Sequence, residues 1–187
     1  MTIGSQPAVP ALDRLDLLAP PVAAALADLA SRSGADTGGL RVDDIGVAEI
    51  DPALADTAAF CERYGVLPGE SANCVVVAGR RDGETRLAAC MVLATTRADV
   101  NGLVRRELDV RKASFAAMAE AVALTGMEYG GITPIGLPAD WPIFVDKAVA
   151  DSPRVVIGSG VRRSKLTLPG AALASLPGAT VLAGLGR

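Results

Sequence analysis

The stretch that most constrains this chain is a loop rich in glycine and proline. It reads Gly-Gly-Ile-Thr-Pro-Ile-Gly-Leu-Pro from Gly130 to Pro138, follows an expected helix, and carries no charge before Asp140. Glycines leave backbone N–H groups uncovered, and prolines limit how far the loop can flex. Such a loop can bring peptide dipoles close to a small polar ligand. Glycine and proline are also the usual residues of structural turns, so a plain turn is the alternative interpretation.

Further segments accompany the loop in a defined order. They are Arg111-Lys112-Ala113-Ser114, Leu124-Thr125-Gly126, Ile143-Phe144-Val145-Asp146, Val155-Val156-Ile157-Gly158-Ser159-Gly160 and Lys165-Leu166-Thr167-Leu168. Together with the loop, they resemble the YbaK family of aminoacyl-tRNA deacylases over roughly residues 44 to 183. This family includes the editing domain inserted in bacterial prolyl-tRNA synthetases. The resemblance implies that the chain binds the aminoacyl end of a mischarged tRNA and hydrolyses its ester without a cofactor.

The length of 187 residues suits one domain with a small appendage. Half of the residues are apolar, which allows a sizeable core, but only 3% are aromatic. The core should therefore consist mainly of alanine, valine and leucine. We expect residues 1–40 to form an N-terminal leader and helical appendage, and residues 41–187 to form the YbaK-like deacylase domain.

The net charge of −3 argues against a broad nucleic-acid surface. The chain has 18 basic and 21 acidic residues, whereas domains that bind nucleic acid along a phosphate track are usually basic. Any contact with tRNA should be local or helped by a partner, for which an aminoacyl-tRNA synthetase is one candidate. Arg105, Arg106, Arg111 and Lys112 form a local basic cluster. This cluster is either a solvated face or a contact for the tRNA acceptor end.

The residue inventory excludes several classes of catalytic site. The chain contains no histidine, so it lacks imidazole as a general base or metal ligand, and with it any Ser–His or Cys–His pair. Cys61, Cys74 and Cys90 form no CxxC pair, and we expect them to be core residues in a reducing compartment rather than a metal site. The N-terminus shows no signal-peptide pattern, and the longest apolar run, from Leu17 to Ala27, is too short to span a bilayer. We therefore expect a cytoplasmic protein with no membrane contact.

Sequence patterns and the resemblance predict a mixed α/β fold, with a largely antiparallel, partly closed sheet surrounded by helices. Residues 1–19 should form a loose leader. Pro20 and Pro21 should then open a helix, since proline is tolerated in the first turn. Gly34 should end this helix in the left-handed conformation, before a flexible Gly38-Gly39 link.

The rest of the chain is expected to alternate strands with helices. A first strand should cover residues 44–50. Asp82-Gly83 should turn an antiparallel hairpin over residues 73–95, because both turn positions favour positive φ. Asp99 should cap a short helix after the hairpin. Short strands should follow near residues 154–158, 165–168 and 180–182.

The helix before the glycine-rich loop is predicted from its apolar spacing. Ser114 should cap its N-terminus and Gly126 should end it. Its buried stripe should consist of Phe115, Met118, Ala119 and Val122. We interpret this stripe as part of the core rather than as a cofactor-binding surface.

The resemblance also implies which residues line a substrate pocket. The backbone of the 130–136 loop should form the floor of the pocket, and its rim should include Asn73, Asp146 and Ser159. The residues expected to act in catalysis are Asn73, Gly131 and Asp146. The residues expected to bind the substrate are Gly130, Ile132, Thr133, Pro134, Gly136, Ser159, Gly160 and Lys112. An aminoacyl ester is already activated, so a positioned water and an oxyanion stabilised by backbone N–H groups can suffice for hydrolysis.

Three of these residues also have structural interpretations. Asp146 can cap the helical turn that follows it, or it can face the α-amino group of the substrate. Ser159 lies between two glycines, where a hairpin turn is a better explanation than a nucleophile without a base. Gly131 leaves space for a ligand if it lines a pocket. If it only supplies a turn conformation, Gly131→Ala should destabilise the fold instead.

One position departs from the family pattern. The family commonly has Lys-Thr-Leu at the start of the hairpin's first strand, where this chain has Asn73-Cys74-Val75. Asparagine donates hydrogen bonds but carries no charge, so the cationic partner for a phosphate or a developing anion is missing. Lys112, Lys147 and Lys165 are candidates to replace it, and the sequence does not rank them. The alternative function is a non-catalytic aminoacyl- or tRNA-binding module that has lost the family lysine.

Overall fold

The computed structural model describes residues 1–32 and 41–187, and within them the strands form three sheets. The strands are β1 (Thr2–Ile3), β2 (Gln6–Pro7), β3 (Val9–Pro10), β4 (Gly46–Glu49), β5 (Ala72–Arg81), β6 (Glu84–Leu93), β7 (Lys112–Phe115), β8 (Ile143–Asp146), β9 (Val155–Gly158), β10 (Ser164–Leu168) and β11 (Ala179–Leu182). Strands β1 and β2 pair alone, a four-stranded sheet has the order β3-β4-β10-β9, and a five-stranded sheet has the order β11-β8-β6-β5-β7. Neighbouring strands are antiparallel except for β8, which runs parallel to β6 and β11.

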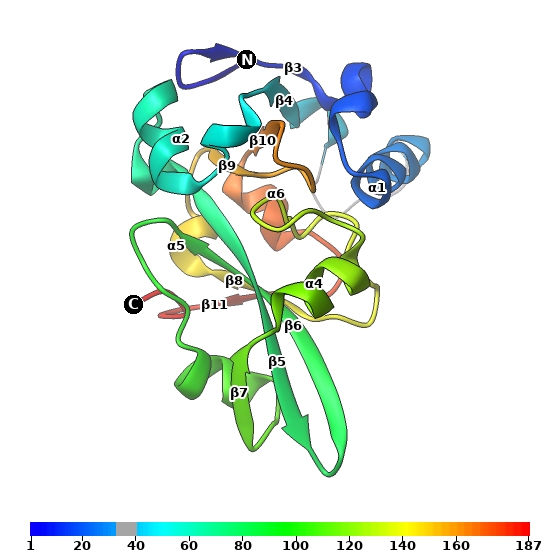
Figure 1. Cartoon of the computed structure of the whole chain (residues 1–187), viewed down its shortest axis with the longest axis vertical. Coiled ribbons are helices and arrows are strands. Elements are labelled where there is room, and N and C mark those ends of the chain that lie inside the picture. Colours follow the sequence, from blue (N-terminus) through cyan, green and yellow to red (C-terminus); the bar gives the residue numbers. More distant parts are fainter. Residues whose placement is uncertain (33–40) are drawn as a thin grey trace.

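Helices surround these sheets (Figure 1). The α-helices are α1 (Pro20–Ser31), α2 (Thr57–Tyr64), α3 (Arg105–Glu107), α4 (Met118–Thr125), α5 (Lys147–Ala150) and α6 (Gly170–Ala174). Short 3-10 helices are η1 (Ala11–Leu17), η2 (Val42–Asp44), η3 (Pro52–Leu54) and η4 (Pro68–Glu70), and η5 (Val100–Val104) is a π-helix that leads into α3. The predicted mixed α/β fold with a largely antiparallel sheet is confirmed. None of the helices within the described ranges is both long and apolar enough to cross a membrane.

The long hairpin β5–β6 is central to the larger sheet, and its tip projects away from the four-stranded sheet (Figure 1). Asp82 and Gly83 turn it with φ angles of 53° and 90°, as predicted. Helix α4 covers one face of the hairpin, where Ala121 packs with Val76. The segment η5–α3 covers the opposite face, where residues such as Val104 belong to a separate apolar cluster. The hairpin therefore packs against a different apolar cluster on each of its faces.

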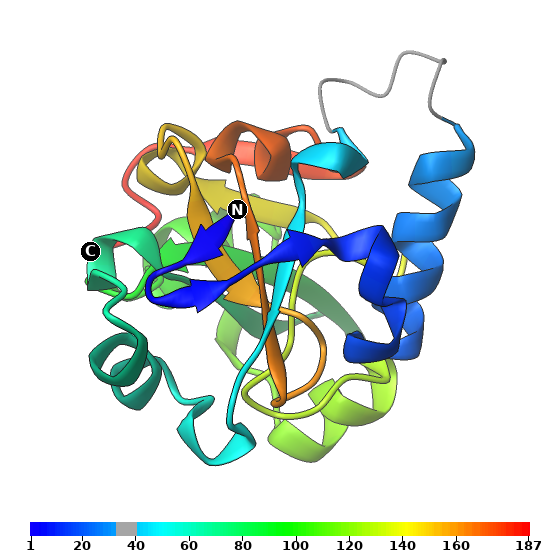
Figure 2. The same ribbon diagram turned by 90° about the horizontal axis from the view of Figure 1, so that it is seen from above.

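The N-terminal segment packs on the same core as the rest of the chain. Residues 1–19, expected to be a loose leader, contain β1 to β3 and η1, and β3 pairs with β4 (Figure 2). The side chains of Ile3 and Leu17 are buried, so tertiary contacts order a segment whose local periodicity is weak. Helix α1 begins at the predicted prolines. The predicted helix end at Gly34 and the link at Gly38-Gly39 lie outside the described residues.

The helix before the glycine-rich loop starts later than predicted. Ser114, expected to cap it, lies inside β7, because this segment pairs with β5. Helix α4 consequently buries Ala121 and Thr125, whereas Phe115 is 60% and Met118 57% exposed. The expected buried stripe was wrong, since strand pairing overrides a local helical pattern.

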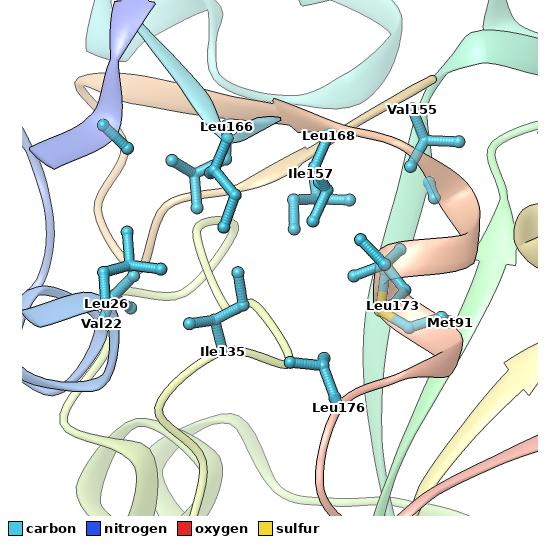
Figure 3. Packing of buried hydrophobic residues seen from close by; sticks show 14 of the residues in the cluster. Val22, Leu26, Met91, Ile135, Val155, Ile157, Leu166, Leu168, Leu173 and Leu176 are labelled. Atoms are coloured by element: carbon cyan, nitrogen blue, oxygen red, sulfur yellow. The ribbon is translucent and has the colours of Figure 1, made fainter. Parts of the chain in front are cut away.

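Aliphatic side chains fill the main core around the glycine-rich loop (Figure 3). Val22 and Leu26 of α1 are fully buried and belong to the same cluster as Ile135 of the loop and Leu166 of β10. Figure 3 shows Ile135 between the α1 side chains and those of the strands. Helix α1 thus supports the outer side of the loop, and the aliphatic core agrees with the low aromatic content.

Candidate functional site

A cavity of about 530 Å³ opens beside the start of β5. Strands β5, β9 and β10 line it, together with α4 and the first part of the glycine-rich loop. Gly130 and Ile132 are the loop residues in its lining. The cavity volume lies within the ~300–1,000 Å³ typical of small-molecule sites. The polar and charged residues that line it include Asp56, Thr57, Ser71, Asn73 and Lys165.

A larger hollow of about 650 Å³ lies beside η5 and α3. Its charged groups are largely paired with each other or with near neighbours. Arg187 Nη2 lies 2.8 Å from Asp99 Oδ2, and Arg106 Nε lies 3.3 Å from Glu107 Oε1. This hollow contains none of the residues that the sequence predicts for the site. The cavity beside β5 is therefore the candidate functional site.

Backbone hydrogen bonds join the glycine-rich loop to the loop after β9. Gly160 N donates to Gly131 O at 2.7 Å, Glu128 N donates to Gly160 O at 2.8 Å, and Gly131 N donates to Glu128 O at 2.9 Å. The carboxylate of Glu128 also accepts a hydrogen bond from Arg162 N at 2.6 Å. The two loops are thereby fixed as one unit at the side of the cavity.

Glycine is required where these two loops touch. A Cβ on Gly131 would lie 2.8 Å from the carbonyl of Val161, and a Cβ on Gly158 would overlap Gly131 O. Such close approaches to backbone cannot be relieved by a side-chain rotation. Gly131 is buried and does not line the cavity. A Cβ at Gly131 would therefore meet protein backbone rather than fill the space of a ligand.

The glycine-rich loop keeps two backbone donors next to the cavity. Gly131 N is engaged by Glu128 O, but the N–H groups of Gly130 and Ile132 donate to no protein group in residues 1–32 and 41–187. Both residues line the cavity. Gly130 has a φ of 83°, a conformation that glycine adopts without steric cost. These two N–H groups are the loop donors that remain for an oxyanion.

Asn73 lies in β5 at the cavity wall, and a neighbouring hydroxyl orients its amide. Thr57 Oγ1, at the first residue of α2, donates to Asn73 Oδ1 at 2.8 Å. This bond occupies the amide oxygen. Within the described part of the chain, Asn73 Nδ2 makes no hydrogen bond, so it remains a donor for a ligand. A neutral donor thus stands where the resemblance implies a lysine.

Lys165 of β10 places a cation in the cavity. It is only 8% exposed, and its Nζ donates to Ala55 O at 2.9 Å and lies 5.3 Å from the centroid of the Phe60 ring. The ammonium has three donors, and Ala55 O is its one hydrogen-bond acceptor among the described residues. Asp56, the carboxylate in the cavity lining, pairs with Arg162 at 3.0 Å instead. Two donors of a buried cation therefore remain for a ligand.

Burial and, to a lesser extent, the nearby Arg162 guanidinium lower the pKa of Lys165 to about 8, against smaller opposing effects of Asp56 and Cys61. An ammonium in water has a pKa of about 10.4. The group is mostly protonated at neutral pH but loses its proton in mild alkali. Strongly shifted groups in cavities are frequent at functional sites.

The structure separates the three lysines that the sequence leaves unranked. Lys112 is exposed in β7, and Lys147 is exposed in α5, where it pairs with Asp151. Lys165 is buried and lines the cavity. Of the three, Lys165 is the candidate to supply the charge that is missing at Asn73.

Asp146 lies outside the cavity lining. It is 5% exposed at the end of β8, and its carboxylate accepts hydrogen bonds from Ala148 N at 2.7 Å and from Gly186 N. The first of these bonds caps α5, which begins at the next residue. Both carboxylate oxygens are engaged in holding backbone, which agrees with the helix-cap alternative.

Several other predicted site residues lie behind the cavity wall. Ser159 is fully buried, and its hydroxyl donates to Ser164 O at 2.9 Å, which fixes the turn between β9 and β10. A Cβ on Gly136 would lie 2.5 Å from Pro21 O of α1, so this glycine allows the loop to approach the helix. Thr133 Oγ1 is buried without a hydrogen-bond partner among the described residues. The residues of this group that do not line the cavity are Thr133, Pro134, Gly136, Ser159 and Gly160.

The three cysteines are free. Burial raises the pKa of each thiol, most strongly for Cys74, which lines the cavity. A protonated thiol is a poor nucleophile. Among the residues that the structure describes, no group of three histidine, cysteine, aspartate or glutamate side chains could hold a metal ion.

Sequence reasoning missed several cavity residues. Thr57, Ser71 and Tyr129 line the cavity but carried no recognised signal in the sequence. Tyr129 is 61% exposed at the cavity mouth, and its ring suits stacking on a nucleic-acid base. The signal that could have ranked Lys165 is its place as the lone charge in the short strand Ser164–Leu168.

Comparisons with known proteins bear on the same region. A family model described as an aminoacyl-tRNA editing domain matches residues 51–176, more than half of the chain. No curated protein sequence matches the chain. A candidate trans-editing enzyme for prolyl-tRNA synthetase superposes with a TM-score of 0.67 at 21% identity, covering 87% of this chain and 97% of that one. A scaffold protein from computational epitope grafting superposes with a TM-score of 0.69 at 20% identity, covering 91% of this chain and 99% of that one. At these identities the superpositions show a shared fold.

Proposed function

Because the chain belongs to the aminoacyl-tRNA editing domain family, we propose that it hydrolyses the ester of a mischarged aminoacyl-tRNA, acting in trans. The observation that carries this proposal is the buried ammonium of Lys165, which lines the same cavity as Asn73 and keeps two donors free. A cation without a carboxylate partner is costly to bury, and its retention in a cavity is explained by an anionic or strongly polar ligand. The reaction would take place where aminoacyl-tRNA is made, in the cytoplasm.

The donors around the cavity suit a reaction that develops negative charge. Attack of water on the ester carbonyl produces a tetrahedral oxyanion, and fixed donors aimed at that oxygen lower the barrier. The proposed donors are Lys165 Nζ, Asn73 Nδ2 and the N–H groups of Gly130 and Ile132. The ester is already activated, so positioning the water contributes most of what remains. Lys165 would then supply the charge that the resemblance assigns to the position of Asn73.

The cavity can also accommodate the substrate's two ends. A volume of about 530 Å³ leaves room for an amino acid and the terminal ribose. Tyr129 and Met118 are exposed at the mouth, where an aromatic ring and a thioether can contact the terminal base. A synthetase that releases mischarged tRNA is the expected source of the substrate.

A deacylation screen against a panel of mischarged tRNAs tests this proposal. Native protein should hydrolyse at least one of them, and Lys165→Met should lower kcat/KM by at least ~10²-fold, as for the loss of one oxyanion donor. Lys147→Met is the matched control, because Lys147 is exposed and pairs with Asp151 away from the cavity. Equal activity of Lys165→Met and native protein would contradict the assignment.

The second candidate function is a non-catalytic binding module, which Asn73 in place of the family lysine favours. It predicts that native protein binds aminoacyl-tRNA without turning over any member of the panel. Binding is measured with a non-hydrolysable aminoacyl amide of the terminal adenosine, and turnover is measured with the tRNA panel. Binding of the amide without turnover of any tRNA would support this alternative over the hydrolase.

A further inference from the structure

Two basic side chains lie next to each other on adjacent strands near the far end of the hairpin. Arg80 of β5 is the register partner of Lys112 of β7, and both side chains are exposed. Residues paired directly across antiparallel strands project from the same face of the sheet. Neither side chain forms a salt bridge with a carboxylate among residues 1–32 and 41–187. They form an uncompensated pair of positive charges, called here the Arg80–Lys112 pair.

Other basic residues on and beside the hairpin have acidic partners. Arg81 and Arg86 both pair with Asp109, which follows α3. Arg111 Nη2 lies 3.1 Å from Asp82 Oδ1 at the hairpin turn. Charge is therefore neutralised around these arginines and left free at the Arg80–Lys112 pair.

The face that carries this pair is also the face that leads to the cavity. Because side chains alternate along a strand, Arg80 shares its face with Val76, and Lys112 shares its face with Ala116 just beyond β7. Val76 and Ala116 both line the cavity. Ala78 and Ser114, the register partners between them, are small, and Ser114 is exposed. At ~3.3 Å per residue along a strand, the pair lies about 13 Å from Val76 and Ala116.

We infer that the Arg80–Lys112 pair binds phosphates of the single-stranded 3′ end of the tRNA, next to the nucleotide whose ester lies in the cavity. This inference rests on the proposed function, because it needs an aminoacyl-nucleotide in the cavity. The occupant follows from charge and geometry: two free cations in line with the cavity suit a flexible polyanion that leaves it along the sheet. Single-stranded nucleic acid is bound by such positively charged tracks with aromatic contacts near them.

The inference also explains how a chain with a net charge of −3 can bind tRNA. Two phosphate contacts form a short track and do not require a basic protein overall. The predicted basic cluster of residues 105–112 is divided by the fold. Lys112 belongs to the cavity face, whereas Arg105 and Arg106 lie in α3 on the opposite face.

The test compares the double variant Arg80→Ala/Lys112→Ala with the control Arg105→Ala/Arg106→Ala. Each is measured on a full mischarged tRNA and on a 3′-aminoacyl-adenosine, which has the ester but no phosphate. We expect the first variant to lower the ratio of kcat/KM for tRNA to kcat/KM for the small ester, and the control to leave this ratio as in the native protein. The slope of log KM against log salt concentration for tRNA should also fall by about 1.4, because two single-strand phosphate contacts are lost.

Equal loss on both substrates, an unchanged salt slope, or the same effect in the control would overturn the inference. If native protein hydrolyses neither substrate, the proposed function fails. The Arg80–Lys112 pair is then tested by fluorescence anisotropy with a single-stranded RNA ending in CCA. Weaker RNA binding by the first variant than by the control would support the phosphate track without hydrolysis, and equal binding would reject it.

Discussion

Replacing Lys165 with methionine separates the cost of this lysine to folding from its role in the site. Methionine keeps an unbranched side chain over the Phe60 ring but removes the ammonium and its hydrogen bond to Ala55 O. We expect the neighbouring cavity residues to keep their positions. The change therefore removes one charge and one hydrogen bond with little change in packed volume.

The magnitude follows from the pKa of Lys165, which burial lowers from 10.5 to about 8. Between these two values the unfolded chain binds more protons than the folded chain, so the free energy of unfolding of the native protein rises with pH across this window. At ~1.4 kcal/mol per pKa unit, the full rise is about 3 kcal/mol. Below about pH 8 the folded protein carries this cost in full, and above pH 10.5 the cost is absent.

Lys165→Met should lack this part of the pH dependence. At pH 7 it gains about 3 kcal/mol from the removed charge and loses ~1–3 kcal/mol because Ala55 O is left without its donor. Its stability should therefore equal that of the native protein or exceed it by up to ~2 kcal/mol at pH 7, and be ~1–3 kcal/mol lower near pH 10.5.

Urea unfolding of both proteins at pH 7, 8, 9 and 10 measures this difference, with Lys147→Met as the control for an exposed lysine. The difference in the free energy of unfolding between native protein and Lys165→Met reports on Lys165 alone, because the two proteins share all other titrating groups. A difference that is constant across the series would refute a buried lysine with a lowered pKa. A large loss of stability at pH 7 would show that Lys165 is primarily structural.

Three further predictions concern the other positions. Gly131→Ala should lower the free energy of unfolding by ~1–3 kcal/mol, because the Cβ would meet the Val161 backbone; thermal melting checks this, and an unchanged melting temperature with impaired ligand binding would restore the pocket interpretation. Asn73→Lys should lower the pKa of Lys165 further, because like charges disfavour each other, and it should therefore not raise the deacylation rate. A deacylation assay checks this, and a raised rate would show that charge at this position is limiting. Asp146→Ala should cost ~0.5–2 kcal/mol through the lost cap and should leave kcat/KM unchanged well below the melting temperature; a selective loss of kcat/KM would place Asp146 in the site.

Local signals in the sequence were sufficient for much of the fold. The turn at Asp82-Gly83 depends only on the conformational preferences of two residues, and the structure has both at positive φ. Asp99 accepts hydrogen bonds from two backbone N–H groups of η5, as its position before a short helix predicts. Asp146 likewise caps α5. These features are set by neighbours in sequence, so the sequence alone predicts them.

Features that depend on distant partners were not predictable in the same way. Ser114 and Phe115 carry a pattern that suits the start of a helix, yet they lie in strand β7 because the edge of β5 is available to them. Gly131 is explained by the backbone of Val161, thirty residues along the chain, which no local pattern indicates. Lys165 could be named as a candidate from the sequence but not ranked, since its burial depends on Phe60 and the segment at Ala55.

The contact between the two larger sheets explains why a cation on either β5 or β10 would lie in the same cavity. The bridge between Ser71 and Val156 brings the start of β5 beside β9, and β9 pairs with β10 so that Lys165 is opposite Gly158. The start of β5, where the resemblance implies a lysine, and Lys165 of β10 therefore line the same space although ninety-two positions separate Asn73 from Lys165. What such a site needs is a positive charge near the carbonyl oxygen, and Coulomb attraction depends on distance and dielectric rather than on the strand that carries the charge. Placing the charge on β10 leaves Asn73 free to donate a neutral hydrogen bond, and it avoids two adjacent ammonium groups that would repel each other.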